Sequence, residues 1–226
     1  MTATKIDFKR ELRELYAPAR EPSLVEVPDL AFLMIDGHGD PNTAPEFSEA
    51  IEALYTVAYA AKFAIKGAPG GIDYRVMPLE GVFWTADMST FATGERSVWD
   101  WTLMIMQPDQ VTSGVFGEAR ATASAKKALD AIGRMRLEVF AEGLAAQVLH
   151  IGPYAAEGPT IQRLHAFIAE QGYERSGRHH EIYLSDPRRS APEGLKTVLR
   201  QPVAGVRPSA ESDLVRQGVV PGRRGR

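Results

Sequence analysis

The chain repeats one pattern of secondary structure, and this repeat constrains its fold more than any other feature. Residues 23–37 read as a hairpin of two strands around a Pro-Asp turn, and residues 136–152 read as a second hairpin around an Ala-Glu-Gly turn. Each hairpin ends at a glycine. Apolar residues at helical spacing then predict a helix over 43–67 in the first half and over 159–172 in the second half.

Two further strands follow each predicted helix, over residues 74–84, 98–106, 179–185 and 195–200. Each half therefore reads ββαββ, with pseudo-repeats over about 23–108 and 135–203. A helix predicted near 117–133 has no counterpart in the second half, so we expect it to link the two halves and to pack over part of the sheet or the rim of a cleft.

Four strands and one helix leave one face of a sheet open, so neither half closes a core by itself. The predicted fold class is α+β, a duplicated ββαββ module that forms one antiparallel eight-stranded sheet. We expect helices on one face and, on the other, a ligand cleft along the pseudo-twofold. This domain should occupy residues 1–208, and the basic end at 209–226 reads as a flexible tail.

Composition excludes several classes of function. There are no cysteines, which rules out disulfides, thiolate metal sites and cysteine nucleophiles and fits a cytoplasmic protein. No apolar run approaches the roughly 18 residues of a membrane helix, and no secretory signal opens the chain. A net charge of −3 gives no drive towards nucleic acid. Exposed sheet edges are compatible with a monomer or a homodimer.

The stretch HHEIYLSD places a carboxylate in the middle of a predicted strand. Alternation puts His179, Glu181 and Tyr183 on one face, and Ile182 and Leu184 on the other. Because Ile182 and Leu184 should face the helices, we expect Glu181 on the concave, helix-free face. The alternative is a glutamate in a salt bridge or at a sheet edge.

Aromatic residues offer candidate walls for a cleft. Tyr154 follows HIGP at a strand-to-helix junction, where a rim would lie, although it could equally be a packing residue. Alternation places Trp101 on the helix-facing side, as a core residue unless a bulge rotates its strand. Trp84 closes a strand in which Gly81 could mark a kink towards the cleft.

No metal site is expected. His179 and His180 are adjacent, so in a strand they point to opposite faces and cannot chelate one ion. His150 could approach His179 and Glu181, but no spacing typical of metal ligands supports this.

Four stretches carry a resemblance to a known family: DYRVMPLEGVFW, VWDWTLMIMQPD, QVLHIGPYAAEGPTI and HHEIYLSDPRR. Together they resemble the GyrI-like small-molecule-binding family, and more closely its stand-alone members than the domains fused to transcription regulators. The resemblance runs from about Phe8 to Val203. It implies a duplicated module on one antiparallel sheet and a ligand cleft with aromatic walls and a buried acid, and Glu181 sits where that acid is expected.

Some stand-alone members of this family are cyclopropanoid cyclopropyl hydrolases, which open the cyclopropane of DNA-alkylating compounds of the duocarmycin and yatakemycin type. The resemblance thus implies a hydrolase. Glu181 would be the general base and Tyr183 the hydrogen-bond donor to the developing phenolate. A flat aromatic ligand would contact Tyr154, Trp84, Trp101 and His179, with no cofactor required.

Two other functions stay open at this point. One is non-catalytic binding and sequestration of aromatic or cationic drugs. The other is an interaction protein of the topoisomerase-inhibitor kind. No helix-turn-helix pattern flanks the matching region, which argues against a transcription regulator.

Overall fold

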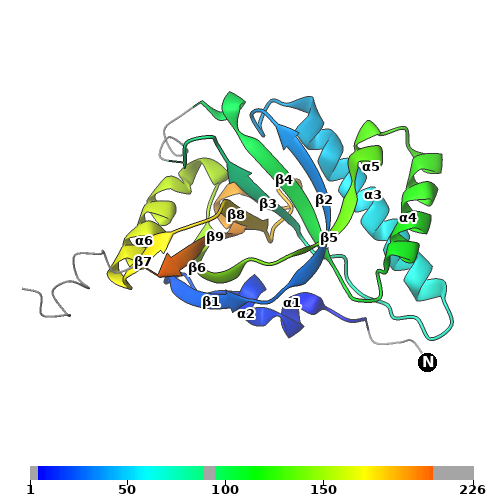
Figure 1. The fold of residues 1–226 in the computed structure, drawn as a ribbon, viewed down its shortest axis with the longest axis horizontal. Coiled ribbons are helices and arrows are strands. Elements are labelled where there is room, and N and C mark those ends of the chain that lie inside the picture. Colours follow the sequence, from blue (N-terminus) through cyan, green and yellow to red (C-terminus); the bar gives the residue numbers. More distant parts are fainter. Residues whose placement is uncertain (1–4, 89–94, 206–226) are drawn as a thin grey trace, which may run out of the picture.

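The computed structural model describes residues 5–88 and 95–205 (Figure 1). These residues contain nine strands: β1 (Ser23–Val27), β2 (Leu30–His38), β3 (Leu79–Trp84), β4 (Asp100–Gln107), β5 (Arg136–Phe140), β6 (Gly143–Ile151), β7 (Tyr173–Arg175), β8 (His179–Tyr183) and β9 (Lys196–Gly205). The helices are α1 (Phe8–Glu11), α2 (Arg13–Tyr16), α3 (Pro45–Gly67), α4 (Ser113–Lys126), α5 (Asp130–Arg134) and α6 (Gly158–Glu170). The tail expected at 209–226 lies outside the described residues.

The predicted duplication is confirmed. All strands belong to one antiparallel sheet in the order β1-β6-β9-β8-β3-β4-β2-β5, and short β7 pairs with β9. The order is symmetric about the contact between β3 and β8: β4 on one side corresponds to β9 on the other, β2 to β6, and β5 to β1. The pseudo-twofold therefore passes between β3 and β8, where the two repeats meet.

The predicted hairpins are wrong, because β1 pairs with β6 and β2 pairs with β5. Val27 is the partner of Gly143, and Leu30 is the partner of Phe140. The residue numbers of every pair in both ladders add to the same total, so the register continues across both breaks without a slip. Each half gives its first strand to the other half. The two bent segments thereby join the ends of the sheet and close it on itself.

Helices α3 and α6 cover the outer face of this closed sheet and lie at opposite ends of it (Figure 1). Helix α3 packs on β2 and β4, and its Leu54 and Val57 are fully buried. Helix α6 packs on β6 through Leu164 and Ile168. In the described part of the chain, no helix has the length and hydrophobicity needed to cross a lipid bilayer.

The segment between the halves links them as predicted, but as two helices, α4 and α5, in place of one. Helix α4 packs against α3. The break is held by contacts from α3: Glu52 binds Lys127 Nζ at 2.6 Å, and Glu49 accepts a hydrogen bond of 2.9 Å from the backbone N–H of Ala131. Glu49 thus accepts from an otherwise unpaired N–H at the start of α5. Because Glu49 lies on α3, the sequence of the linking segment alone does not predict this break.

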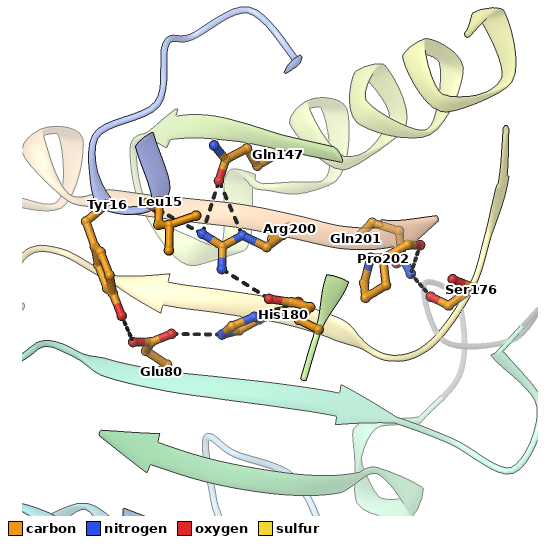
Figure 2. A network of polar contacts seen from close by, with 10 residues as sticks. Leu15, Tyr16, Glu80, Gln147, Ser176, His180, Arg200, Gln201 and Pro202 are labelled. Atoms are coloured by element: carbon orange, nitrogen blue, oxygen red, sulfur yellow. Dashed lines mark hydrogen bonds and ion pairs between the residues drawn. The ribbon is translucent and has the colours of Figure 1, made fainter. Parts of the chain in front are cut away.

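The inner face of the sheet is filled by apolar side chains and one buried polar network (Figure 2). The imidazole of His180 lies between two carboxylates, 2.9 Å from Glu142 and 3.1 Å from Glu80. Tyr16 donates a 2.6 Å hydrogen bond to Glu80, and Arg200 donates a 3.1 Å hydrogen bond to Glu142. The network therefore pairs two carboxylates with one imidazole and one guanidinium.

Electrostatics fix the charges in this network. Burial alone would lower the pKa of His180, but Glu142 and Glu80 raise it to about 9. Burial would raise the pKa of Glu142, but His180 and Arg200 lower it to about 2. Arg200 also donates to the carbonyl oxygen of Leu15 at 2.8 Å, so the same network fastens the end of α2 to the sheet (Figure 2).

Candidate ligand-binding groove

A groove of about 1500 Å³ runs along the outer face of the sheet, beside α3. Residues of β3 and β8 form its floor, and residues 184–189 also line it. The groove thus lies at the pseudo-twofold, as predicted. The face is different from the expected one: the groove shares the face of the helices, because the closed sheet leaves its other face filled by packed side chains.

Helix α3 supplies an apolar wall with one residue every fourth position: Phe47, Ile51, Tyr55, Tyr59 and Phe63. Four residues turn an α-helix by roughly 40° more than one full turn, so this stripe winds slowly from the core towards solvent. Phe47 packs edge-on against Trp101, with ring centroids 5.0 Å apart, whereas Phe63 is 60% exposed. The rings of Tyr55, Tyr59 and Phe63 follow one another at 6.4 Å. The groove therefore has a mainly aromatic wall, and the outer end of that wall, at Phe63, is exposed to solvent.

Glu181 lies on the floor of the groove and is held by two neighbours on its own strand. Tyr183 Oη donates a 2.7 Å hydrogen bond to its Oε2, and His179 Nε2 lies 3.3 Å from its Oε1. Burial alone would raise the pKa of Glu181, but His179 and Tyr183 outweigh burial and lower it. Glu181 is therefore a carboxylate at neutral pH.

A second carboxyl group, that of Glu157, lines the same groove. Glu157 stands between the 3₁₀ turn η3 (Tyr154–Ala156) and α6, and it is 5% exposed. Its Oε1 atom is buried without a hydrogen-bond partner among residues 5–88 and 95–205. Burial and the negative charge of Glu181 raise the pKa of Glu157 to about 9. At neutral pH Glu157 is therefore protonated beside the ionised Glu181.

Sequence reasoning missed Glu157. The available signal was its position: an acid three residues after Tyr154, at the strand-to-helix junction already expected to form a rim. Tyr154 does line the groove, and its ring meets that of Tyr183 edge-on with centroids 5.5 Å apart. Arg96, also in the lining, stacks over the ring of Trp99 at 5.2 Å. The positive charge of Arg96 acts to lower the pKa of both Glu157 and Glu181.

The other residues predicted from sequence lie elsewhere. His179 is 2% exposed and supports Glu181 from beneath. Trp101 is fully buried in the core, as its alternation indicated. Trp84 alternates with Phe83, a groove residue, and so points to the opposite side of β3, where the Arg178 guanidinium covers its ring at 3.5 Å. The tryptophan that lines the groove is Trp99.

The histidines near this site make other contacts. His150 Nδ1 lies 3.0 Å from the hydroxyl of Thr160. Among the residues that the structure describes, no three histidine, aspartate or glutamate side chains are grouped as a metal ion would need.

Comparisons with known proteins agree with this architecture. A profile of the GyrI-like small molecule binding domain matches residues 20–204. A solved structure of an uncharacterized conserved protein from Listeria innocua is 40% identical, with a TM-score of 0.82 over 88% of this chain and 100% of that chain. A Listeria innocua protein named a hydrolase is 39% identical, with a TM-score of 0.78 over 88% of this chain and 100% of that one.

The C-terminal domain of EcmrR shares the fold at 14% identity, with a TM-score of 0.51 over 82% of this chain and 98% of that chain. A search of curated proteins gave no significant match.

Proposed function

The chain belongs to the GyrI-like small-molecule-binding family, and from this premise we propose that it is a hydrolase that opens the cyclopropane ring of duocarmycin- and yatakemycin-type compounds. The observation that carries the proposal is Glu181, an ionised carboxylate on the floor of an aromatic groove. The Listeria innocua relative that is named a hydrolase supports an enzymatic role.

The reactive part of these compounds is a cyclopropane fused through one carbon to a cyclohexadienone. Water attacks the methylene carbon, and the bond from that carbon to the spiro carbon breaks. The electron pair of the broken bond enters the six-membered ring, which becomes aromatic. The attacking water loses a proton, and negative charge develops on the former dienone oxygen.

Glu181 is the group proposed to orient this water and to accept its proton. Its position is fixed before substrate arrives, because Tyr183 and His179 hold both carboxylate oxygens. The hydroxyl of Tyr183 already donates a hydrogen bond to Glu181, so we assign it a positioning role in place of the phenolate contact suggested by the sequence. The α3 stripe and Tyr154 offer the area on which a flat ligand would stack.

The test compares the wild type with Glu181→Gln, which keeps the size of the side chain and removes the base. A duocarmycin-type compound is incubated with each protein, and the ring-opened product is followed by mass spectrometry. We expect turnover to fall by roughly 10²–10⁴, the usual contribution of a positioned base. Glu170→Gln, an exposed position at the end of α6, is the matched control and should keep full activity.

Ligand affinity should change much less than turnover in Glu181→Gln, because aromatic area supplies most of the binding. A wild-type protein that returns the compound intact would overturn the hydrolase proposal. A Glu181→Gln protein as fast as the wild type would leave the hydrolase standing and remove this residue from its mechanism.

A second candidate function is non-catalytic binding of cationic aromatic drugs. The observation that favours it is the pair of carboxyl groups, Glu157 and Glu181, facing one aromatic groove. A bound cation would favour ionisation of Glu157. Binding would then release a proton to the buffer, which calorimetry in buffers of different ionisation enthalpy detects. Proton release together with recovery of intact ligand would support this second function over the first.

A further inference from the structure

We propose that Glu157 is a catalytic residue of the same site, the acid that protonates the dienone oxygen as the cyclopropane opens. This inference rests on the proposed hydrolase function and adds its missing half, because a base alone leaves the developing negative charge without a proton. The argument starts from the groove itself. Glu157 lines it, is almost completely buried, and has an Oε1 atom without a hydrogen-bond partner in the described residues.

The competing donors in the groove are less suitable. The hydroxyl of Tyr183 is engaged by Glu181. Tyr154 is oriented towards the groove, but burial raises its pKa above the usual value of 10.0. A general acid works best when its pKa is close to the operating pH. The carboxyl of Glu157, with a pKa of about 9, comes closer to that condition and carries its proton at neutral pH.

The charged and titratable groups around Glu157 come from several elements. Burial is the main cause of the raised pKa of Glu157, and the charge of Glu181 on β8 raises it further. The hydroxyl of Thr197 on β9 and the charge of Arg96 act to lower it. Burial raises the pKa of Tyr154 and of Tyr183, and the negative charge of Glu181 raises both further, so both phenols stay protonated at neutral pH. Two neighbouring carboxyl groups whose pKa values are driven apart supply an acid and a base at the same pH.

The proposed step balances in atoms and charge. The water oxygen bonds to the methylene carbon, its proton passes to Glu181, and the carbon–carbon bond breaks. The electron pair of that bond becomes part of the aromatic ring, and the former dienone oxygen takes the proton of Glu157. The product is the substrate plus one water. Glu181 has then gained a proton and Glu157 has lost one, and exchange with solvent restores both.

The proposal predicts a bell-shaped dependence of kcat/KM on pH. The acidic limb reports the ionisation of Glu181, and the alkaline limb reports the loss of the Glu157 proton, near pH 9. Glu157→Gln keeps the shape of the side chain and a hydrogen-bond donor but has no proton to transfer. We expect it to lose roughly 10² or more in kcat/KM and to lose the alkaline limb, while Glu170→Gln keeps both.

A series of substrates separates proton transfer from a structural role. The loss in Glu157→Gln should shrink as the product phenol becomes more acidic, since a more stable phenolate needs less help from an acid. A merely structural residue would give the same loss for every member of the series. Glu157→Asp retains a transferable proton, so it should be slower than the wild type yet keep the alkaline limb.

The outcomes distinguish this inference from the function on which it rests. Wild-type turnover combined with an unchanged rate and alkaline limb in Glu157→Gln overturns the acid role and leaves the hydrolase intact. Loss of the alkaline limb in Glu157→Asp, with its fold shown intact by circular dichroism, also contradicts the acid role. A wild type without turnover overturns the function, and the acid role falls with it.

Discussion

The hydroxyl of Tyr183 donates a 2.7 Å hydrogen bond to Oε2 of Glu181, two residues earlier on the same face of β8. The phenol therefore acts on the carboxylate, and through it on any water that the carboxylate holds. Tyr183→Phe removes this donor and should raise the pKa of Glu181, because the hydrogen bond favours the ionised form.

A base must be ionised to accept a proton, so the acidic limb of the kcat/KM profile should move to higher pH in Tyr183→Phe, with a smaller loss near neutral pH. Rates measured across the pH range check this. A uniform loss at every pH, with the acidic limb in place, would instead make Tyr183 a donor to substrate.

The outer end of the α3 stripe should bind ligand without supporting the fold. Phe63 is 60% exposed, so Phe63→Ala should leave the free energy of unfolding nearly unchanged. Loss of one aromatic contact, worth about 0.5–1.5 kcal/mol, should lower the affinity for an elongated flat ligand by about 2- to 13-fold. Val139→Ala on β5 is the control, since Val139 is similarly exposed at 59% and lies outside the groove lining. Titrations that give Phe63→Ala and Val139→Ala the same ligand affinity would count against an aromatic outer wall.

The inner network should contribute stability through paired charges. Glu142→Gln leaves Arg200 and His180 without one carboxylate inside the sheet, and loss of one partner of a buried ion pair costs about 3–5 kcal/mol. Urea denaturation measures this loss, and Glu170→Gln again serves as the exposed control. A change below about 1 kcal/mol would mean that water reaches the inner face.

Stability should fall on both sides of mildly acidic pH. The pKa of Glu142 is lower in the folded chain, about 2 against 4.5, so its contribution is present above pH 4.5 and is lost as pH falls towards 2. The pKa of His180 is higher in the folded chain, about 9 against 6.5, so its contribution is present below pH 6.5 and is lost as pH rises to 9.

Glu157 adds to the alkaline decline. Folding raises its pKa from 4.5 to about 9, so stability also decreases across that interval as the unfolded chain releases the proton first. Unfolding free energies at a series of pH values check the whole curve. In Glu157→Gln the decline between pH 4.5 and 6.5 should flatten, and the decline above 6.5 should persist because His180 remains. A curve that rises from pH 6.5 to 9 would contradict these assignments.

The repeated pattern predicted most of the fold, because strand alternation and helical spacing are local properties of the chain. Pairing between strands is not local. The segments around Pro28 and Gly143 look like two hairpin turns, yet each is a bend within one long strand that pairs with the other segment. Nothing in either turn distinguishes these arrangements. The choice follows from how the whole sheet closes.

The same reasoning explains the candidate site. Alternation placed His179, Glu181 and Tyr183 together correctly, since they share one strand. Which face would be open depended on the closure of the sheet and was predicted wrongly. Glu157 could not be recognised as the partner of Glu181, because the two are brought together only by the packing of η3 beside β8, and its raised pKa arises from that burial.

The exchange of first strands between the halves also bears on ancestry. Within its own half, β2 pairs only with β4 and β6 only with β9, so a single ββαββ module could fill the second edge of this strand only with a second copy of itself. The single-module precursor implied by the repeat would then have been a homodimer whose chains exchanged their first strands, with one groove on the dimer axis. Fusion of two copies freed the halves to diverge. One side of a formerly symmetric groove could keep the acids of β8 and η3, while the other became the aromatic wall of α3.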